Sequence, residues 1–303
     1  MLVETIDALS ILSNGIYLDC TFGRGGHSKE ILKLLDSEGR LIALDKDLDA
    51  INEGKKIKDK RFEIHHCAFS EMDKILKKKN IKKLDGILMD LGISSPQVDE
   101  AKRGFSFKSN AFLDMRMDQS KGITAAEVLN TYKEKDLVDI LRNFGEEKFA
   151  KKIVKAIIKY RENEGPIKKT LELAELIKNT VPIKNSKKDP STKTFQALRI
   201  YVNKEIEELE NALPIAFKSL KPKGRLVVIS FHSLEDRIVK NYTKLQMKTD
   251  FISKKIPIKL SEIKLAPFKI VQKMIIPNLE EIKQNPRSRS EKLRVIEKVM
   301  EAK

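Results

Sequence analysis

Four apolar runs rich in Ile, Leu and Val recur in the first ninety residues, separated by helical or loop stretches. The runs cover residues 16–20, 41–44, 62–69 and 86–91. Strands that are apolar along their whole length are typical of a parallel sheet with helices on both faces. Ligands of such sheets bind at the carboxyl ends of the strands. The rhythm therefore predicts an α/β fold and places the functional residues directly after strands.

A helical segment interrupts this rhythm after about Pro96. Between residues 124 and 181, apolar residues such as Leu137, Ile140 and Leu141 recur at helical spacing. Residues 184–193 contain Pro190 and several polar residues, which predicts an exit loop. A helical insertion is the simplest interpretation.

The chain returns to the sheet after the insertion. Residues 194–213 read as one long helix, residues 224–231 as a buried strand, and residues 268–276 and 292–299 as edge strands. We therefore expect a discontinuous sheet domain and an inserted all-helical domain. The predicted domains are 1–102 with 194–303, and 103–193.

The charge balance fits a polyanionic partner. Sixty Lys and Arg residues against 44 Asp and Glu residues give a net charge of +16, which is typical of nucleic-acid-binding proteins. Only 13 of the 60 are Arg, and a genome-wide preference for lysine would give the same charge. Charge alone leaves both readings open.

Other features exclude several classes of protein. Cys20 and Cys67 form no CxxC pair and the four histidines lack metal-ligand spacing, so we expect no metal. No run reaches the roughly 18 uncharged apolar residues of a membrane span, and residues 1–12 lack a basic start. We expect a cytoplasmic protein without a membrane association or an obligate protein partner.

A glycine-rich loop follows the first strand. Gly23, Gly25 and Gly26 precede His27 and a helix that begins near Ser28. Glycines let the backbone approach a cofactor, and the first turn of a helix offers unpaired N–H groups. The dinucleotide fingerprint needs glycine where Ser28 stands, which disfavours a nicotinamide or flavin site. A purely structural turn is the alternative.

Two further strand ends carry candidate cofactor contacts. Asp45 ends the second strand, where a carboxylate can accept hydrogen bonds from both hydroxyls of a ribose. Phe69 ends the third run and can flank an adenine, although a core position is the commoner role of such a residue. Asp45 and the glycine loop together favour an adenosine-containing cofactor.

The candidate catalytic residues are Asp90 and His232. Asp90 ends the fourth strand and precedes a loop of Gly, Ser and Pro, where a carboxylate can orient a substrate amino group or the cofactor. His232 follows the fifth strand; substrate contact and a satisfied, partly buried histidine are both open. Ser233 and Asp236 have the spacing of a capping box, which predicts a helix start.

Basic and aromatic residues in two loops are candidates for RNA contact, because bases stack on aromatic rings and phosphates bind cations. Packing of the aromatics at a domain junction and solvated basic loops are the alternatives. The candidates are Arg103, Phe105, Phe107, Arg116, Arg287 and Arg289.

Seven motifs in order along the chain resemble one family. They are 19–28, 90–97, 103–107, 113–118, 194–199, 231–237 and 285–290. Any one of them could arise by chance, but jointly they resemble the family of small-subunit ribosomal RNA cytosine-N4 methyltransferases.

The resemblance implies a Rossmann-like, class I S-adenosylmethionine-dependent methyltransferase fold whose helical insertion helps to bind RNA. It implies methyl transfer from S-adenosylmethionine to N4 of a cytidine in the decoding region of 16S rRNA, within a small ribosomal subunit or a late assembly intermediate. The implied cofactor contacts are Gly25, Gly26, His27, Asp45, Phe69, Asp90 and Gln97.

Two departures from related patterns matter. The family usually has a His-x-Pro-Val segment just before the residues aligned with Leu2 and Val3, so we expect part of the site's rim to be absent. DNA amino-methyltransferases commonly carry Asp/Asn-Pro-Pro-aromatic, whereas Asp90 is followed by Leu91 and Gly92. Backbone carbonyls of the loop 92–96 are therefore candidates beside Asp90 for holding the target amine.

Three alternatives remain at this stage. The chain could methylate another RNA or DNA base, act as a nicotinamide-dependent oxidoreductase, or bind RNA without catalysis. The oxidoreductase shares the glycine loop and Asp45 but leaves the basic insertion unexplained. The binding protein explains the charge but not the carboxylates Asp19, Asp45 and Asp90 at successive strand ends.

Overall fold

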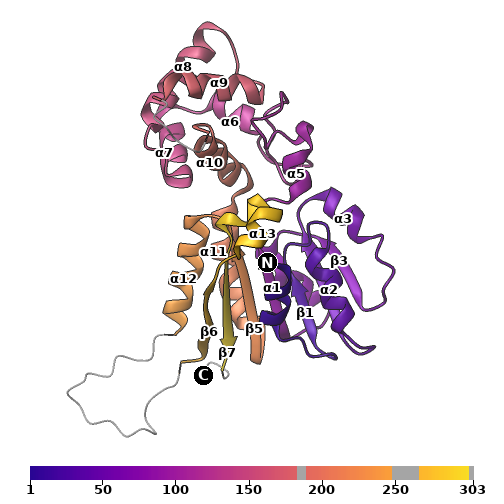
Figure 1. The fold of residues 1–303 in the computed structure, drawn as a ribbon. Helices are drawn as coiled ribbons and strands as arrows, with labels where there is room; N and C mark the ends of the chain where they lie inside the picture. The colour runs from indigo at the N-terminus through magenta and orange to yellow at the C-terminus, as the bar shows by residue number, and fades with distance from the viewer. Residues whose placement is uncertain (183–188, 248–265, 300–303) are drawn as a thin grey trace, which may run out of the picture. The chain divides into compact units, whose positions relative to one another are not determined.

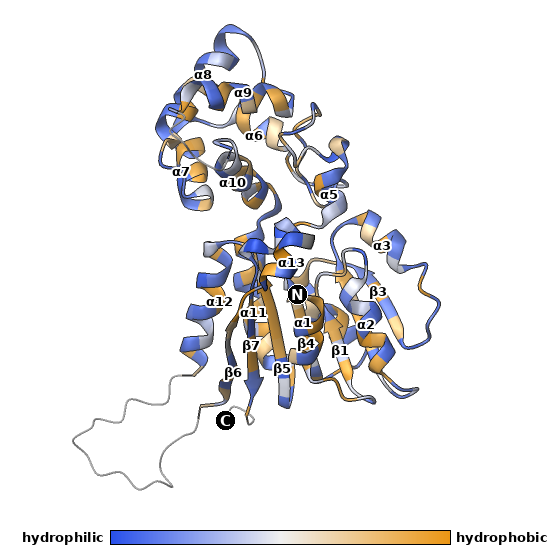
Figure 2. Ribbon diagram, in the orientation of Figure 1, coloured by the Kyte–Doolittle hydropathy of each residue, from blue (hydrophilic) through white to orange (hydrophobic). Residues whose placement is uncertain are grey.

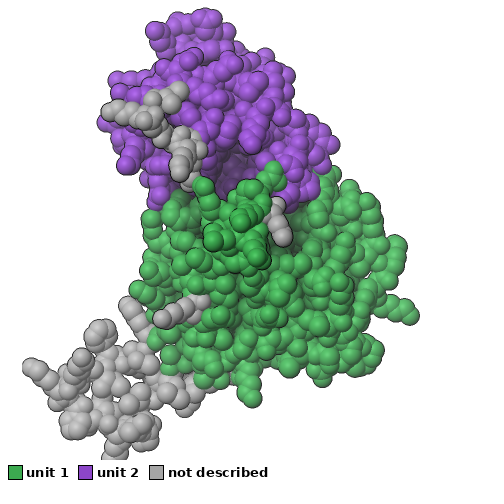
Figure 3. All heavy atoms as spheres, in the orientation of Figure 1, with its two compact units in different colours: residues 1–92, 206–303 green, residues 93–205 purple. Residues whose placement is uncertain are grey.

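The chain forms two compact units, which Figure 3 colours separately. The structure, a computed structural model, describes residues 1–182, 189–247 and 266–299. Unit 1 comprises Met1–Gly92 and Ile206–Lys303, and unit 2 comprises Ile93–Glu205. Unit 2 begins before and ends after the insertion expected at 103–193, because Ile93 packs on its core and its last helix supplies core residues.

Unit 1 is built on a seven-stranded sheet in the order β3-β2-β1-β4-β5-β7-β6 (Figure 1). The strands are β1 (Ile16–Asp19), β2 (Arg40–Asp45), β3 (Phe62–His66), β4 (Leu84–Asp90), β5 (Leu220–Ser230), β6 (Phe268–Ile275) and β7 (Lys292–Lys298). β1 to β5 are parallel, and β7 pairs antiparallel with both β5 and β6. The parallel sheet that the apolar runs predicted is confirmed.

The strand order decides which residues meet at the carboxyl edge. β1 lies between β2 and β4, so Asp19 is flanked by the strands that end at Asp45 and Asp90. Because β7 is antiparallel, its first residue pairs with the last residue of β5: Ser230 lies opposite Lys292. The start of β7 therefore belongs to the same edge as the ends of the parallel strands.

Helices cover both faces of this sheet. Alternate strand residues point to opposite faces, so Tyr17 belongs to one hydrophobic cluster with α1 and α2, and Leu18 to another with α4 and α11. The helices are α1 (Leu2–Leu9), α2 (Gly26–Leu34), α3 (Leu48–Gly54), α4 (Met72–Lys78), α11 (Glu205–Ser219), α12 (Ser233–Gln246) and α13 (Leu279–Gln284), with short 3-10 turns at Phe69–Glu71 and Pro286–Ser290. The sheet is thus the middle layer of three.

Unit 2 is helical with its own hydrophobic core. Its helices are α5 (Ser95–Asp99), α6 (Ala125–Thr131), α7 (Glu134–Gly145), α8 (Ala150–Asn163), α9 (Thr170–Thr180) and α10 (Thr192–Asn203), with a 3-10 turn at Ala101–Arg103. Figure 2 shows hydrophilic and hydrophobic residues mixed along these helices, as amphipathic helices require. The helical spacing read between residues 124 and 181 is confirmed.

Two predicted elements were wrong. The third strand ends at His66, and Phe69 starts the 3-10 turn instead of ending the strand. The long helix expected at 194–213 is two helices, since Lys204 has left-handed backbone angles with φ of 53° between α10 and α11. The exit loop expected at 184–193 lies partly outside the described residues, which resume at Asp189.

Within the part of the chain that the structure describes, no helix has the length and apolar character that crossing a membrane requires.

Candidate active site

The loop after β1 is held by Asp19. Its buried carboxylate accepts hydrogen bonds from the Thr21 N–H (3.1 Å) and the Ser28 hydroxyl (2.6 Å). Burial raises the pKa of Asp19 to about 6. Ser28, which breaks the dinucleotide fingerprint, therefore fastens the first turn of α2 to the end of β1.

Gly25 and Gly26 differ in what a side chain at each position would meet. Gly25 has φ of 75°, and a Cβ there would lie 2.6 Å from the ring of Phe22. Gly26 opens α2, and a Cβ there would meet nothing within 4 Å. Gly25 is fixed by the backbone, whereas the space beside Gly26 is open to a ligand.

Asp45 faces the same loop from the end of β2. Its Oδ2 accepts a hydrogen bond from the Gly23 N–H and its Oδ1 one from the Asp47 N–H, each at 2.8 Å. Burial raises the pKa of this carboxyl. Each carboxylate oxygen can accept more than one hydrogen bond, so these contacts orient the group and leave capacity for ligand hydroxyls.

Phe69 lies three residues beyond the end of β3. It is half-buried at the start of the 3-10 turn and packs beside the cluster that contains α4. Its position at the carboxyl edge keeps it a candidate for adenine contact, and its packing fits the structural role equally.

Asp90 and His27 face each other at the ends of β4 and the glycine loop. His27 Nδ1 lies 3.6 Å from Asp90 Oδ2, and the backbone N–H of Asp90 donates to the Thr21 hydroxyl at 2.7 Å. Asp90 Oδ1 and His27 Nε2 are shielded from solvent and have no hydrogen-bond partner among the described residues. Buried polar atoms are normally paired, so these two atoms mark a place for a polar ligand.

The pKa values of this pair move in opposite directions. Burial, reinforced by the negative charges of Glu291 and Asp19, raises the pKa of Asp90 to about 8. Burial lowers the pKa of His27 to about 4, which makes its imidazole neutral at pH 7. The histidine therefore supplies no positive charge against the carboxyl.

Glu291 adds a further carboxylate that sequence reasoning missed. It directly precedes β7 and is buried, and burial raises its pKa. The antiparallel addition of β7 brings it to the carboxyl edge, and nothing local in the sequence signals that pairing. Glu291 lies 3.5 Å from the Met1 ammonium, so Asp19, Asp45 and Asp90 are the carboxyls that remain at this edge for a cationic ligand.

The start of α12 corrects the predicted capping box. The N-cap is His232, whose Nδ1 accepts from the Glu235 N–H at 3.4 Å, while Glu235 Oε2 accepts from the N–H of Phe231 at 2.8 Å. Ser233 and Asp236 were the predicted pair, but β5 ends at Ser230 and the helix begins one residue earlier. Glu235 was missed for the same reason.

Asp236 serves the sheet instead. Its carboxylate pairs with Arg294 at 2.7 Å and Lys292 at 3.3 Å on β7. Hydrogen bonding to Arg294 lowers the pKa of Asp236 against the opposing effect of burial. The pairing fastens α12 to β7 beside the site.

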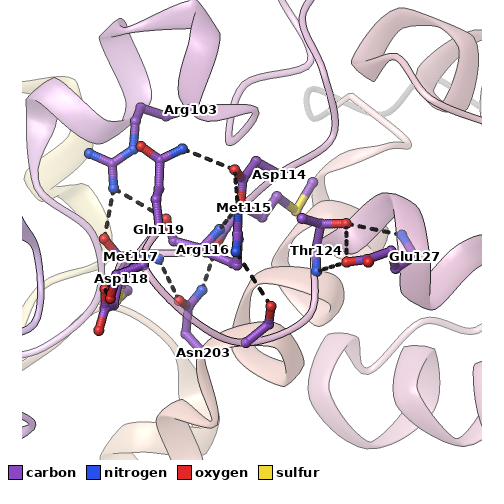
Figure 4. A network of polar contacts seen from close by, with 12 residues as sticks. Arg103, Asp114, Met115, Arg116, Met117, Asp118, Gln119, Thr124, Glu127 and Asn203 are labelled. Carbon is purple, nitrogen blue, oxygen red and sulfur yellow. Dashed lines mark hydrogen bonds and ion pairs between the residues drawn. The ribbon is translucent and has the colours of Figure 1, made fainter.

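Of the five candidate residues in unit 2, three form side-chain hydrogen bonds there (Figure 4 shows two of these three). Gln97 is buried, and its Oε1 accepts from the Ser94 N–H at 2.9 Å. Arg103, 2% exposed, donates to the carbonyls of Arg116 (3.2 Å) and Met117 (2.9 Å). The Arg116 guanidinium pairs with Asp114 at 2.7 Å. All three side chains have structural contacts, and their ligand contacts stay predictions.

The remaining RNA candidates differ in exposure. Phe105 is buried in the core of unit 2, and Phe107 packs edge-on against Phe195 with ring centroids 5.2 Å apart. Arg287 and Arg289 are exposed in the 3-10 turn before β7 of unit 1. The aromatics have the packing role that was their alternative, and the two arginines have the exposure that phosphate contact needs.

Comparison with known proteins identifies the family. The model of the MraW methylase family matches residues 1–299. The chain belongs to the MraW methylase family. It is therefore a methyltransferase, with S-adenosylmethionine as the methyl donor, and unit 1 is its Rossmann-like methyltransferase fold.

Two relatives of this family member match it along nearly its whole length. It is 47% identical over 298 residues to "Ribosomal RNA small subunit methyltransferase H" of Methylobacillus flagellatus, covering 98% of this chain and 93% of the relative. It is 46% identical over 299 residues to the protein of the same name from Dechloromonas aromatica, covering 99% and 97%. The crystal structure of an rRNA methylase from Streptococcus thermophilus aligns with a TM-score of 0.44 and 10% identity, covering 98% and 95%.

The site residues fit the methyl donor. S-adenosylmethionine carries a sulfonium and an ammonium cation and no phosphate, which suits the carboxyls Asp19, Asp45 and Asp90. The open space at Gly26 and the unpaired atoms of Asp90 and His27 offer room and polar partners.

Proposed function

We propose that this methyltransferase transfers the methyl group of S-adenosylmethionine to N4 of a cytidine in the decoding region of 16S rRNA. The observation that carries the proposal is the 47% identity to a ribosomal RNA small subunit methyltransferase over 98% of the chain. The resemblance of the sequence motifs supplies the base and the atom. The relatives' names support rRNA as the partner, and a cytoplasmic location and an assembled or nearly assembled small subunit are part of the proposal.

The proposed cofactor contacts are Gly25, Gly26, His27, Asp45, Phe69, Asp90 and Gln97. S-adenosylmethionine supplies an already electrophilic methyl group, so the protein's task is to align the amine with it and to exclude water. The glycine loop and α2 would bind one end of the donor, and Asp45 the ribose hydroxyls.

Asp90 and His232 are the proposed catalytic residues. The N4 lone pair of cytosine is delocalised into the ring, and an acceptor for its hydrogens favours the tetrahedral nitrogen of the transition state. Asp90 Oδ1 is a suitable acceptor because it has no partner among the described residues, with the carbonyls of the loop 92–96 as the other candidates. His232 follows β5 on the same edge, where it would contact the substrate base.

Arg103, Phe105, Phe107, Arg116, Arg287 and Arg289 are the proposed RNA-binding residues. Arg287 and Arg289, being exposed, would contact phosphate directly. Buried Arg103 and Phe105 would act by shaping the surface around them.

Methyl transfer from labelled S-adenosylmethionine to small subunits from cells lacking the enzyme, followed by nucleoside mass analysis, tests this function. We expect N4-methylcytidine, and at least a hundredfold lower rate for Asp90→Ala, in the range of lost transition-state contacts. A different methylated nucleoside would contradict the assignment of the base. Full activity of Asp90→Ala would contradict the proposed role of Asp90 and leave the rest of the proposed function intact.

A further inference from the structure

One stretch of unit 2 carries positive charge without any acidic residue. Residues 148–161 contain five Lys and one Arg, and no Asp or Glu, although the whole chain has 44 acidic residues among 303. Most of this stretch forms α8. A general lysine preference would leave lysines mixed with carboxylates, as they are on α4 with its pairs to Glu71 and Asp73.

The lysines of α8 lie on one face. Successive helical residues turn by about 100°, so Lys151, Lys152, Lys155 and Lys159 fall within roughly 100° of one another. All four are exposed, while the opposite face of α8 is buried in the core of unit 2. From Lys151 to Lys159, eight residue steps, the helix rises about 12 Å. We call these four residues the α8 lysine face.

Within the described part of the chain, this face includes one carboxylate, that of the exposed Glu162 in the last turn of α8, about 20° around the helix from Lys151, so four positive charges stand against one negative charge. None of its four lysines forms an ion pair there, whereas Lys178 on α9 pairs with Asp189 at 3.2 Å. Arg161, at the end of the same helix, turns inward and donates to the carbonyls of Leu129 and Tyr132. The positive charge that faces solvent therefore comes from the lysines alone.

We propose that the α8 lysine face binds the phosphate backbone of the RNA substrate; this rests on the proposed function. Lysine ammonium groups bind phosphates as point charges, without reading base sequence. Such contacts position an RNA and raise its affinity while the site in unit 1 selects the base. The spacing of the four lysines along one side of a helix suits a single strand or a helix edge that runs beside α8.

The chemistry of α8 argues against a membrane partner. A helix that lies on a lipid surface needs an exposed apolar stripe beside its cations. The apolar residues Ile153, Val154 and Ile157 are all fully buried in the core of unit 2. What remains outside can attract anions but cannot insert into lipid.

The test is the salt dependence of RNA binding by the fourfold variant Lys151→Gln, Lys152→Gln, Lys155→Gln and Lys159→Gln. Glutamine keeps the helix propensity of lysine, and unchanged thermal unfolding and cofactor binding would show that the variant is folded. The probe is a labelled 30-nucleotide single strand of decoding-region sequence, measured by fluorescence anisotropy between 50 and 300 mM KCl.

We expect the variant to bind this RNA roughly tenfold or more weakly at the lowest salt. The slope of log K against log salt should fall in magnitude by about 3, since each lost phosphate contact contributes about 0.7 for a single strand. In the methylation assay KM for small subunits should rise while kcat is retained. An unchanged salt slope would overturn the inference.

A matched control removes the same charge elsewhere. Lys55, Lys58, Lys60 and Lys78 are exposed in unit 1 and lie before β3 or β4, at the amino edge of the sheet away from the site. Their fourfold substitution by Gln should leave the slope near the wild-type value. An equal fall in both variants would mean that net charge, not this face, attracts RNA, and would overturn the inference.

The remaining outcomes separate this surface from the proposed function. A reduced slope in the α8 variant, with wild-type enzyme that fails to methylate small subunits, would retain the RNA surface and reject the rRNA substrate. Methylation of small subunits by the wild-type enzyme, with an unchanged salt slope in the α8 variant, would retain the rRNA substrate and reject the α8 lysine face as an RNA surface. Binding to phosphatidylserine vesicles that the α8 variant loses, with RNA binding unaltered, would assign the face to a membrane and overturn the inference.

Discussion

Adjacent glycines in the loop after β1 offer a test of whether the loop serves the backbone or the cofactor. In Gly25→Ala the new Cβ would lie 2.6 Å from the Phe22 ring in a left-handed conformation, which should lower the free energy of unfolding by about 1–3 kcal/mol. In Gly26→Ala the Cβ meets open space at the first position of α2. Stability should be kept or raised by up to about 1 kcal/mol.

Stability should be lost in Gly25→Ala, whereas the loss in Gly26→Ala should be one of cofactor affinity. Gly26→Ala should bind S-adenosylmethionine at least roughly tenfold more weakly by calorimetry, because its methyl group fills the space that the proposed contact needs. Thermal unfolding and calorimetry on both variants check the pair. A stable Gly26→Ala enzyme with unchanged affinity would exclude close approach of the cofactor at Gly26.

Asp90 predicts proton release on cofactor binding. With its pKa raised to about 8 in the free protein, the carboxyl is mostly protonated at pH 7. A bound cation favours the carboxylate, so binding at pH 7 should release up to about one proton and affinity should rise from pH 6 to pH 8. Calorimetry in buffers of different ionisation enthalpy measures the proton, and Asp90→Asn should abolish its release.

The same shift has a consequence for stability. Between pH 4 and pH 8 the native state holds a proton on Asp90 that the unfolded chain has lost, so this residue makes the free enzyme less stable as the pH rises. In the Asp90→Asn variant, the free energy of unfolding should therefore decline less steeply as the pH rises. A wild-type enzyme whose cofactor binding is independent of buffer and pH would contradict the raised pKa.

At the scale of the element, strands were easier to predict than the ends of helices. β1, β2 and β4 are buried on both faces of the sheet, so their consecutive residues are apolar and the strands can be predicted from the local sequence. The break between α10 and α11 cannot be predicted from the local sequence, because residues around Lys204 have ordinary helix propensity. There Asn203 donates to the Met115 carbonyl and accepts from the Met117 N–H, contacts to a segment more than eighty residues away.

The site shows the same limit. Asp19, Asp45 and Asp90 end their strands and could be predicted from the sequence. Glu291 reaches the carboxyl edge only because β7, the last strand along the chain, runs antiparallel to β5, and this pairing depends on the whole sheet. Glu235 and Asp236 could each have closed a capping box, and one residue in the length of β5 decided between them.

The break at Lys204 can be tested by substitution. A residue other than glycine in the left-handed region costs about 1 kcal/mol, so Lys204→Gly should raise the free energy of unfolding by about 0.5–1 kcal/mol. Lys240→Gly, at an exposed position inside α12, should lower it by about 1 kcal/mol. Urea unfolding of both variants checks the prediction, and two losses of equal size would contradict a left-handed Lys204.

For the whole molecule, the two units differ in how they are connected along the chain. Unit 2 is one continuous segment with its own hydrophobic core, and unit 1 is assembled from two segments around a different sheet. Separate cores of this size generally unfold as separate cooperative units. We therefore expect two transitions in differential scanning calorimetry of the intact protein.

The cofactor product should act unequally on these transitions. Six of the seven proposed contacts lie in unit 1, and Gln97 alone lies in unit 2. S-adenosylhomocysteine at about 100 times its Kd stabilises a binding unit by about 2.7 kcal/mol, which for unit 1 corresponds to a rise of roughly 5–10 °C. Gly25→Ala should lower the same transition and thereby assign it.

The second transition then reports on Gln97. If Gln97 contacts the cofactor, the transition of unit 2 should rise as well, by less than that of unit 1, and Gln97→Ala should remove this rise alone. A single transition that moves as a whole with the cofactor would instead mean that the two cores unfold together. In that case the insertion would be part of one cooperative structure, and RNA held on unit 2 would stabilise the site in unit 1 by the same linkage.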